Sequence, residues 1–277
     1  MIPGPNLIYK CPKCKKTVYR GSLRSGNTLG AKLFSDGRRI APMLPEFPFI
    51  VKCKECNTFF WLNDKNKIGK YSRWFNFGKK WANPDVAEIL SLNEYFEAIK
   101  SKIYSNKDEE QFLRLNLWRA FNDRTREGRD IFLTEDDKDI YESNCIALIE
   151  MLDKNETKNK IMIAELYRNL GKYIECNNML NSIIDKGCAR LKEILKKECE
   201  KNNKYVIEIL EEVRKKKSGM LTEDRRARVR ERVRANRARD RDRAMAKAAI
   251  ARAMGSLTQR IKKQIIQKLR LFVRRRG

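Results

Sequence analysis

Two Cys-x-x-Cys motifs constrain this chain more than any other feature. Cys11 and Cys14 lie in "IYKCPKCKK", and Cys53 and Cys56 lie in "FIVKCKECNTFF". Each motif places two thiolates on one tight turn, close enough to hold the same ion. Two such turns brought together by β-strands form a tetrahedral all-thiolate site, which suits zinc. We therefore predict that these four cysteines bind one zinc ion.

The sequence between the motifs explains their wide separation. The 38 intervening residues exceed the usual spacing of roughly 15–20, and they contain strand-like segments. "KTVYRGSL" predicts one strand, and "AKLFSDGRRIAPM" predicts two short strands around an Asp36–Gly37 turn. "FPFIVKC" and "NTFFWL" predict strands that enter and leave the second motif. Asn57 suits the left-handed conformation of such a turn better than Lys15 does. The pattern is typical of a zinc ribbon with an inserted hairpin, over residues 1–83.

The metal is predicted to stabilise the fold, because four cysteines close the zinc shell and a catalytic zinc keeps an open position. The chain has no histidine, which excludes Ser-His and Cys-His nucleophile systems and histidine general bases. A thioredoxin-type redox motif would open a helix, which neither cysteine pair does. "GSLRSGNT" has the glycine spacing of a phosphate loop but lacks its lysine. We expect no enzymatic activity and no small-molecule substrate.

The positive charge is concentrated at the two ends of the chain. Net charge is +26. Residues 1–80 contain 17 Lys and Arg against 4 Asp and Glu, and residues 221–277 contain 20 against 5. Residues 81–220 are nearly balanced, with 25 against 27. The ends are therefore where a polyanion would bind, and nucleic acid is the partner we expect.

Aromatic and basic residues interleave in "KIGKYSRWFNFGKKWANP", residues 67–84. Single-stranded nucleic acid binds such surfaces, because bases stack on the rings and phosphates pair with the cations. Alternatively, the rings cover the small ribbon against the helical region, and both interpretations stay open here. The nucleic-acid candidates in this segment are Lys70, Arg73, Trp74, Lys79 and Lys80.

From residue 84 the apolar pattern has the period of α-helices, and we predict a helical domain over residues 84–217. Thr134, with Asp137 three residues later, is the expected N-cap of one helix. The predicted helices cover residues 84–103, 108–128, 135–153, 156–170, 174–185 and 189–216. Carboxylates gather in their first turns, where the helix dipole favours them, rather than in catalytic pairs.

Residues 164–183, "AELYRNLGKYIECNNMLNSI", resemble a tetratricopeptide repeat. Small, aromatic and large apolar residues stand where that repeat has them, Gly171 is in the turn, and Cys176 replaces the usual alanine. The resemblance implies a close helix pair, and arrays of such pairs bind proteins, although a single repeat can equally serve packing. The order of a four-cysteine zinc ribbon followed by such helices is similar to that of uncharacterised bacterial proteins. That similarity implies an architecture but no activity.

The composition changes abruptly near residue 218. In residues 221–277 Arg outnumbers Lys 16 to 4, whereas in residues 1–220 Lys outnumbers Arg 29 to 13. Arginine contributes bidentate phosphate contacts that lysine does not, so we expect this arm to contact nucleic acid. A solvated arm without a dedicated ligand is the alternative. The candidates are Arg226, Arg228, Arg230, Arg232 and Arg234.

"SLTQRIKKQIIQKLRLFVRRR", residues 256–276, predicts a basic amphipathic helix. Such a helix can dock on its own protein, enter a partner's groove or lie on an anionic membrane. No apolar run is long enough to span a membrane, and we expect a cytoplasmic protein. In all, the sequence predicts an α+β chain: a zinc ribbon, a helical domain, and a basic arm over residues 218–277.

Overall fold

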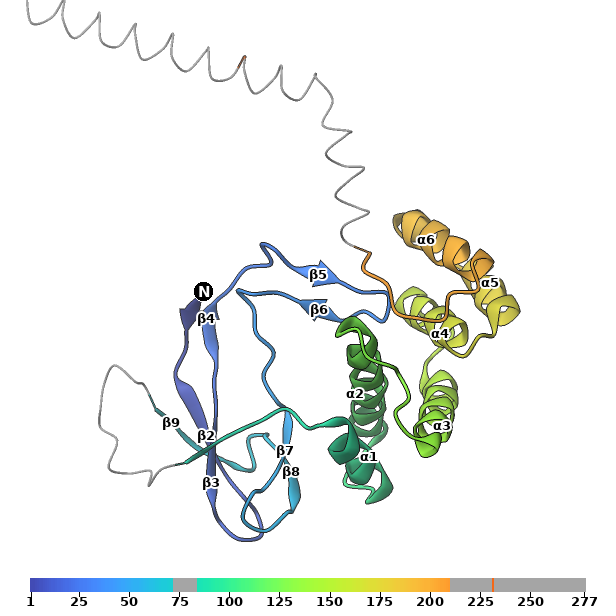
Figure 1. Ribbon diagram of the computed structural model, residues 1–277. Helices are drawn as coiled ribbons and strands as arrows, with labels where there is room; N and C mark the ends of the chain where they lie inside the picture. Colours follow the sequence, from blue (N-terminus) through green and yellow to red (C-terminus); the bar gives the residue numbers. More distant parts are fainter. Residues whose placement is uncertain (72–83, 210–230, 232–277) are drawn as a thin grey trace, which may run out of the picture. The chain divides into compact units, whose positions relative to one another are not determined.

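Figure 1 shows a computed structural model of the chain, which describes residues 1–71, 84–209 and 231. The chain divides into two compact units, Met1–Val213 and Arg214–Gly277. The description below concerns the first unit. The finer division into residues 1–83, 84–217 and 218–277 stays a prediction.

A four-stranded sheet is the centre of the β lobe, a name we give to residues 1–71 together with residues 85–86. Its order is β10 (Asp85–Val86), β3 (Thr17–Arg20), β2 (Asn6–Lys10) and β9 (Lys67–Tyr71). β2 pairs antiparallel with both β3 and β9, whereas β10 pairs parallel with β3. Because side chains alternate along a strand, buried Tyr9 and Val18 share one face of the sheet.

Three two-stranded sheets complete the β lobe. They are β1 (Ile2–Pro3) with β4 (Leu23–Ser25), β5 (Lys32–Leu33) with β6 (Arg39–Ile40), and β7 (Ile50–Lys52) with β8 (Phe59–Trp61). Gly37 has a φ of +74° in the turn between β5 and β6, a conformation that glycine adopts without steric cost. The strands predicted around the Asp36–Gly37 turn and beside the second cysteine motif are therefore confirmed, whereas the single strand predicted over "KTVYRGSL" ends at Arg20, and Leu23 begins the separate strand β4.

In the described residues that follow, there are six α-helices, with one 3₁₀ turn among them. They are α1 (Leu92–Lys100), α2 (Lys107–Arg126), α3 (Glu135–Met151), α4 (Thr157–Asn169), α5 (Tyr173–Asn181), the 3₁₀ turn (Lys186–Cys188) and α6 (Ala189–Glu200). The predicted cap of α3 is confirmed. The Thr134 hydroxyl accepts from the Asp137 backbone N–H, and the Asp137 carboxylate accepts from the Thr134 N–H, which is a capping box. Gly171, with a φ of +74°, lies in the turn between α4 and α5, as predicted.

The helix predicted from residue 84 begins later, at Leu92. Residues 85–86 form β10 instead, and the Ala87 N–H donates to the Tyr19 carbonyl at 2.8 Å. Ser91 then caps α1 in a capping box with Glu94. Pairing with a distant strand thus replaces the first two turns of the predicted helix, because a backbone group that pairs with β3 cannot also bond within a helix.

The last predicted helix, 189–216, is also too long, because α6 ends at Glu200. Asn202 has a φ of +53°, which stops the helix. The chain then returns in extended form, and the N–H of Ile209 donates to the carbonyl of Leu33 at 2.8 Å. A bridge joins Phe34 to Glu208. Residues 210–216 lie outside the described part of the chain.

The largest core joins the β lobe to the helices. Ile50 of β7 belongs to the same buried cluster as Trp118 and Phe121 of α2, and Trp61 of β8 packs against that cluster. The Trp61 indole N–H also donates to the Ile103 carbonyl at 3.3 Å. A second core surrounds the cysteine turns, and a third lies between α4, α5 and α6.

A charged pair is fully buried where α4 meets the returning segment. The side chains of Glu165 and Arg168 have no exposed surface, and Arg168 Nη2 lies 2.6 Å from Glu165 Oε1. Arg168 also donates to the carbonyls of Asn203 and Tyr205. The arginine therefore fixes residues 203–205 against α4, and those residues lead to the segment whose Glu208 forms an isolated bridge with Phe34 of the β5–β6 hairpin.

The predicted α+β class is confirmed, since small β-sheets precede six helices. Among the described residues, no helix combines the length and the apolar character needed to cross a membrane.

Candidate metal centre and its basic surroundings

The first cysteine motif forms a tight turn between β2 and β3. The N–H of Cys11 donates to the Lys16 carbonyl at 2.8 Å, and the N–H of Lys15 donates to the Cys11 carbonyl at 3.1 Å. Lys15 has a φ of +66°, although a long side chain is less suited to that conformation than asparagine. Its amine donates to the Pro12 carbonyl at 2.6 Å, so the side chain folds back over the turn.

The second motif repeats this geometry between β7 and β8. The N–H of Cys53 donates to the Thr58 carbonyl at 2.9 Å, and the N–H of Asn57 donates to the Cys53 carbonyl at 2.8 Å. Asn57 has a φ of +55°, as its position in the sequence predicts. The two turns are therefore equivalent in backbone structure, with the second cysteine of each followed by a left-handed residue.

The four cysteines come together where the two turns face each other. The Sγ atoms of Cys11 and Cys56 are 3.6 Å apart, and those of Cys14 and Cys53 are 3.5 Å apart. All four sulfur atoms lie within 4.8 Å of one another. Cys11 and Cys53 are fully buried, whereas Cys14 is exposed. The cluster could hold a metal ion, and the sequence predicted its four members.

The thiols differ in acidity within this cluster. Burial raises the pKa of Cys53 to about 12. By contrast, the hydrogen bond between Cys56 Sγ and the Thr58 side chain, together with the Thr58 backbone, lowers the pKa of Cys56 to about 6. A bound cation would favour the thiolate form of every ligand, including the buried Cys53.

The sheet and the second hairpin support the cluster from both sides. Tyr9 and Val18 from the sheet pack with Val51 and Phe60 from the β7–β8 hairpin around Cys11 and Cys53. This core has few members, and the two cysteine turns are joined by no disulfide. A metal bridge between them would therefore add a large share of the local stability.

Of the ten predicted nucleic-acid residues, only Lys70 lies in the described part of the chain. It is exposed on β9, opposite Leu7 of β2. The other nine lie outside the described residues, and so does the predicted helix 256–276. Those outside are Arg73, Trp74, Lys79, Lys80, Arg226, Arg228, Arg230, Arg232 and Arg234.

The sequence analysis did not single out the lysines around the first cysteine turn. Lys10, Lys13 and Lys15 are exposed there, and Lys65 is exposed on the adjoining loop. The N–H of Lys10 donates to the Asn66 carbonyl at 2.8 Å, which holds that loop beside β2. Among described residues these four lysines form no ion pair; we name them the turn lysines. The alternation of lysine with the motif residues in "KCPKCK" is the sequence feature that could have predicted this group of lysines.

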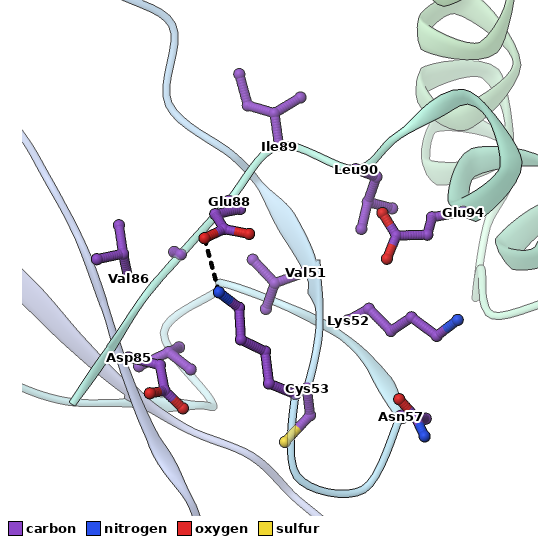
Figure 2. Close-up of a pocket in the computed structure, with 13 residues that line it drawn as sticks. Val51, Lys52, Cys53, Asn57, Asp85, Val86, Glu88, Ile89, Leu90 and Glu94 are labelled. Atoms are coloured by element: carbon purple, nitrogen blue, oxygen red, sulfur yellow. Dashed lines mark hydrogen bonds and ion pairs between the residues drawn. The ribbon is translucent and has the colours of Figure 1, made fainter.

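A cavity of about 310 Å³ lies beside the second cysteine turn, and Figure 2 shows its lining. Val51, Cys53 and residues 85–90 form its walls. The Lys54 amine and the Glu88 carboxylate meet across it at 2.7 Å. The only thiol in the wall is Cys53, whose raised pKa makes it a poor nucleophile. The cavity therefore offers paired charges rather than a reactive group.

Comparisons of the chain with protein-family models, with curated proteins and with solved structures find no match. The resemblances to a zinc ribbon and to a tetratricopeptide repeat thus stay predictions.

Proposed function

We propose that this chain is a zinc-stabilised, non-enzymatic adaptor that binds nucleic acid without sequence preference. The donor set supports zinc, because four thiolates are the soft ligands that zinc prefers in structural sites. With Zn–S bonds of about 2.3 Å, a tetrahedral site has sulfur atoms about 3.8 Å apart. The separations of 3.5 and 3.6 Å in two of the pairs need little adjustment to reach that geometry. Four cysteines would leave no open position, which favours a stabilising role.

The turn lysines are the observation that carries the nucleic-acid proposal. Lys10, Lys13, Lys15 and Lys65 are exposed around a turn that the metal would make rigid. Residues 1–71 contain 14 Lys and Arg against 4 Asp and Glu. Lysine ammonium groups pair with phosphates of any sequence, so counterion release would dominate the affinity. Lys70 and the basic residues outside the described part of the chain would extend the same interaction.

The helical part gives the adaptor its second surface in this proposal. The α4–α5 pair has buried Ala164 and Cys176 where the helices meet, and both belong to one cluster. That close packing supports the repeat-like interpretation, and arrays of such helix pairs bind proteins on a concave face. A protein partner for residues 91–200 is therefore part of the proposal. The zinc ribbon would then contact nucleic acid, and the repeat-like helices would contact a protein partner through a separate surface.

A salt titration of binding to single-stranded RNA and duplex DNA tests the nucleic-acid part. The variant Lys13→Glu/Lys15→Glu should bind more weakly than the wild type. Its slope of log K against log salt should be shallower by roughly 1.4–1.8, because each lost phosphate contact removes about 0.7–0.9. The matched control is Lys154→Glu/Lys172→Glu, which changes net charge equally on two exposed lysines of the helical part. Zinc content of both variants confirms that the cysteine turns are intact.

Two results would contradict this function. The first is an absence of binding to either nucleic acid at low salt. The second is an equal loss of affinity in both lysine variants. That result would mean that the turn lysines act only through the net charge of the chain and not through contacts with phosphates. Binding to anionic vesicles alone would instead favour a membrane-associated adaptor that acts through residues 256–276.

A further inference from the structure

The end of the β lobe opposite the cysteine turns exposes aliphatic side chains. β1 and β4 extend the β2–β3 ladder away from the first cysteine turn (Figure 1). At this end Leu29 is 79% exposed and Leu44 is 40% exposed. We name the group the aliphatic tip, and its members are Met1, Ile2, Leu23, Leu29 and Leu44.

The loops that carry these side chains are in contact, and the Leu23 and Leu44 side chains lie close together. A Cβ atom placed on Gly26 would lie 3.0 Å from Leu44 Cδ1 and 3.5 Å from Leu23 Cδ1. A Cβ on Gly30, next to Leu29, would lie 3.9 Å from Pro42 Cγ. Ile2 is opposite Ser25, at the end of β4. Contiguous aliphatic side chains at a loop tip are unusual on a surface that faces only water.

The segments that form the tip carry positive charge. The carboxylates closest to them in the sequence are either buried or paired with an arginine. Residues 1–35 contain no Asp or Glu, and Arg24 and Arg39 are exposed. Asp36 is buried in an ion pair with Arg126. Glu46 lies 3.0 Å from Arg38. The tip therefore combines an aliphatic surface with uncompensated guanidinium groups.

We propose that the aliphatic tip docks on an anionic membrane surface. The leucines would enter the boundary between head groups and acyl chains, while Arg24 and Arg39 pair with lipid phosphates. Nucleic acid would engage the same cations but offers no acyl layer for Leu29 and Leu44. Its residues are distinct in the sequence from the turn lysines and from residues 256–276. It adds a second partner to the function proposed above and does not depend on it.

Flotation of the full chain with vesicles of phosphatidylcholine, with and without phosphatidylserine, tests the proposal. Leu29→Ser and Leu44→Ser should each lower the partition coefficient on phosphatidylserine vesicles by about tenfold, because each removes one buried leucine. Arg24→Gln/Arg39→Gln should lower binding to these vesicles and leave binding to pure phosphatidylcholine unchanged. The matched control is Ile184→Ser, which removes a 94% exposed aliphatic side chain from the helical part and should change nothing.

Wild-type partition in both leucine variants would overturn the proposal and assign any membrane binding to another segment. An equal loss in Ile184→Ser would overturn it too, because the effect would then be one of general hydrophobicity. So would a wild-type chain that fails to float with phosphatidylserine vesicles. Nucleic-acid binding, measured on the same leucine variants, should stay at the wild-type level. Failure of this proposal is thereby distinguished from failure of the adaptor function.

Discussion

Replacing Arg168 by methionine should remove a large part of the stability of this chain. Arg168 and Glu165 are both without exposed surface, so the variant leaves a buried carboxylate without its partner. Breaking a buried ion pair in this way costs about 3–5 kcal/mol. The carbonyls of Asn203 and Tyr205 lose their donor as well, which costs about 1–3 kcal/mol each. Taken at their lower ends, these contributions give an expected loss of about 5 kcal/mol.

Urea denaturation followed by far-ultraviolet circular dichroism measures this loss. Proteins of this kind have free energies of unfolding of about 5–15 kcal/mol, so Arg168→Met should lose about a third or more of its stability. The double variant Glu165→Leu/Arg168→Met removes both charges and should recover about 3 kcal/mol, because no buried charge remains unpaired. The control is Arg129→Met, whose ion pair with Glu127 is more than half exposed; it should cost less than about 1 kcal/mol.

If the free energy of unfolding of Arg168→Met lies within about 1 kcal/mol of the wild-type value, the ion pair is solvated in solution and the predicted cost of an orphaned charge is wrong. That predicted cost is also wrong if the double variant is no more stable than the single one. That result would mean that the lost carbonyl contacts, and not the orphaned charge, determine the cost.

Two further predictions concern the cysteine cluster and the cap of α3. Cys14→Ser should reduce bound zinc from about one ion per chain to a small fraction, because the site loses one of four ligands; elemental analysis after dialysis measures it. Asp137→Asn should cost about 2–3 kcal/mol at neutral pH, because Arg124 and the Leu133 N–H lose a charged acceptor. Burial alone would raise the pKa of Asp137, but the bonds from Leu133 and Arg124 outweigh it and lower the pKa. The stability that the Asp137 carboxylate contributes is therefore complete at pH values above the ordinary carboxyl pKa. It is lost as the pH falls through the lowered pKa of Asp137 in the folded state. The gap between wild type and variant should accordingly close in acid denaturation below about pH 4.

The parts of this fold that the sequence predicted are those with local causes. Cys-x-x-Cys spacing determines a turn by itself, and Asn57 adopts the left-handed conformation that the turn requires. Thr134 and Asp137 form their capping box within four residues. Gly37 and Gly171 mark their turns for the same reason, because each needs a positive φ that other residues resist.

The parts that the sequence did not predict depend on distant partners. Residues 85–87 have a helical apolar pattern, yet their backbone pairs with β3 because that strand has a free edge there. Glu165 and Arg168, three residues apart on one helix, have the spacing of a solvent-exposed pair. They are buried because the chain returns after Asn202 and covers them. No periodicity within α4 could reveal that cover.

The cysteine cluster and the Arg168 network stabilise different ends of the first compact unit, which leads to a last prediction. The cluster joins the β2–β3 turn to the β7–β8 turn, whereas Ile209 and Leu33 pair beside the buried charges. Removing zinc with a chelator should therefore speed hydrogen exchange at the amides of Cys11 and Cys53, which the turns now protect. The amide of Ile209 donates to Leu33 on the β5–β6 hairpin, which α2 holds through the Arg126–Asp36 ion pair, and it should keep its protection. Equal loss of protection at all three amides would show that the β lobe and the helices unfold as one cooperative unit. The core around Ile50 and Trp118 would then couple the two parts.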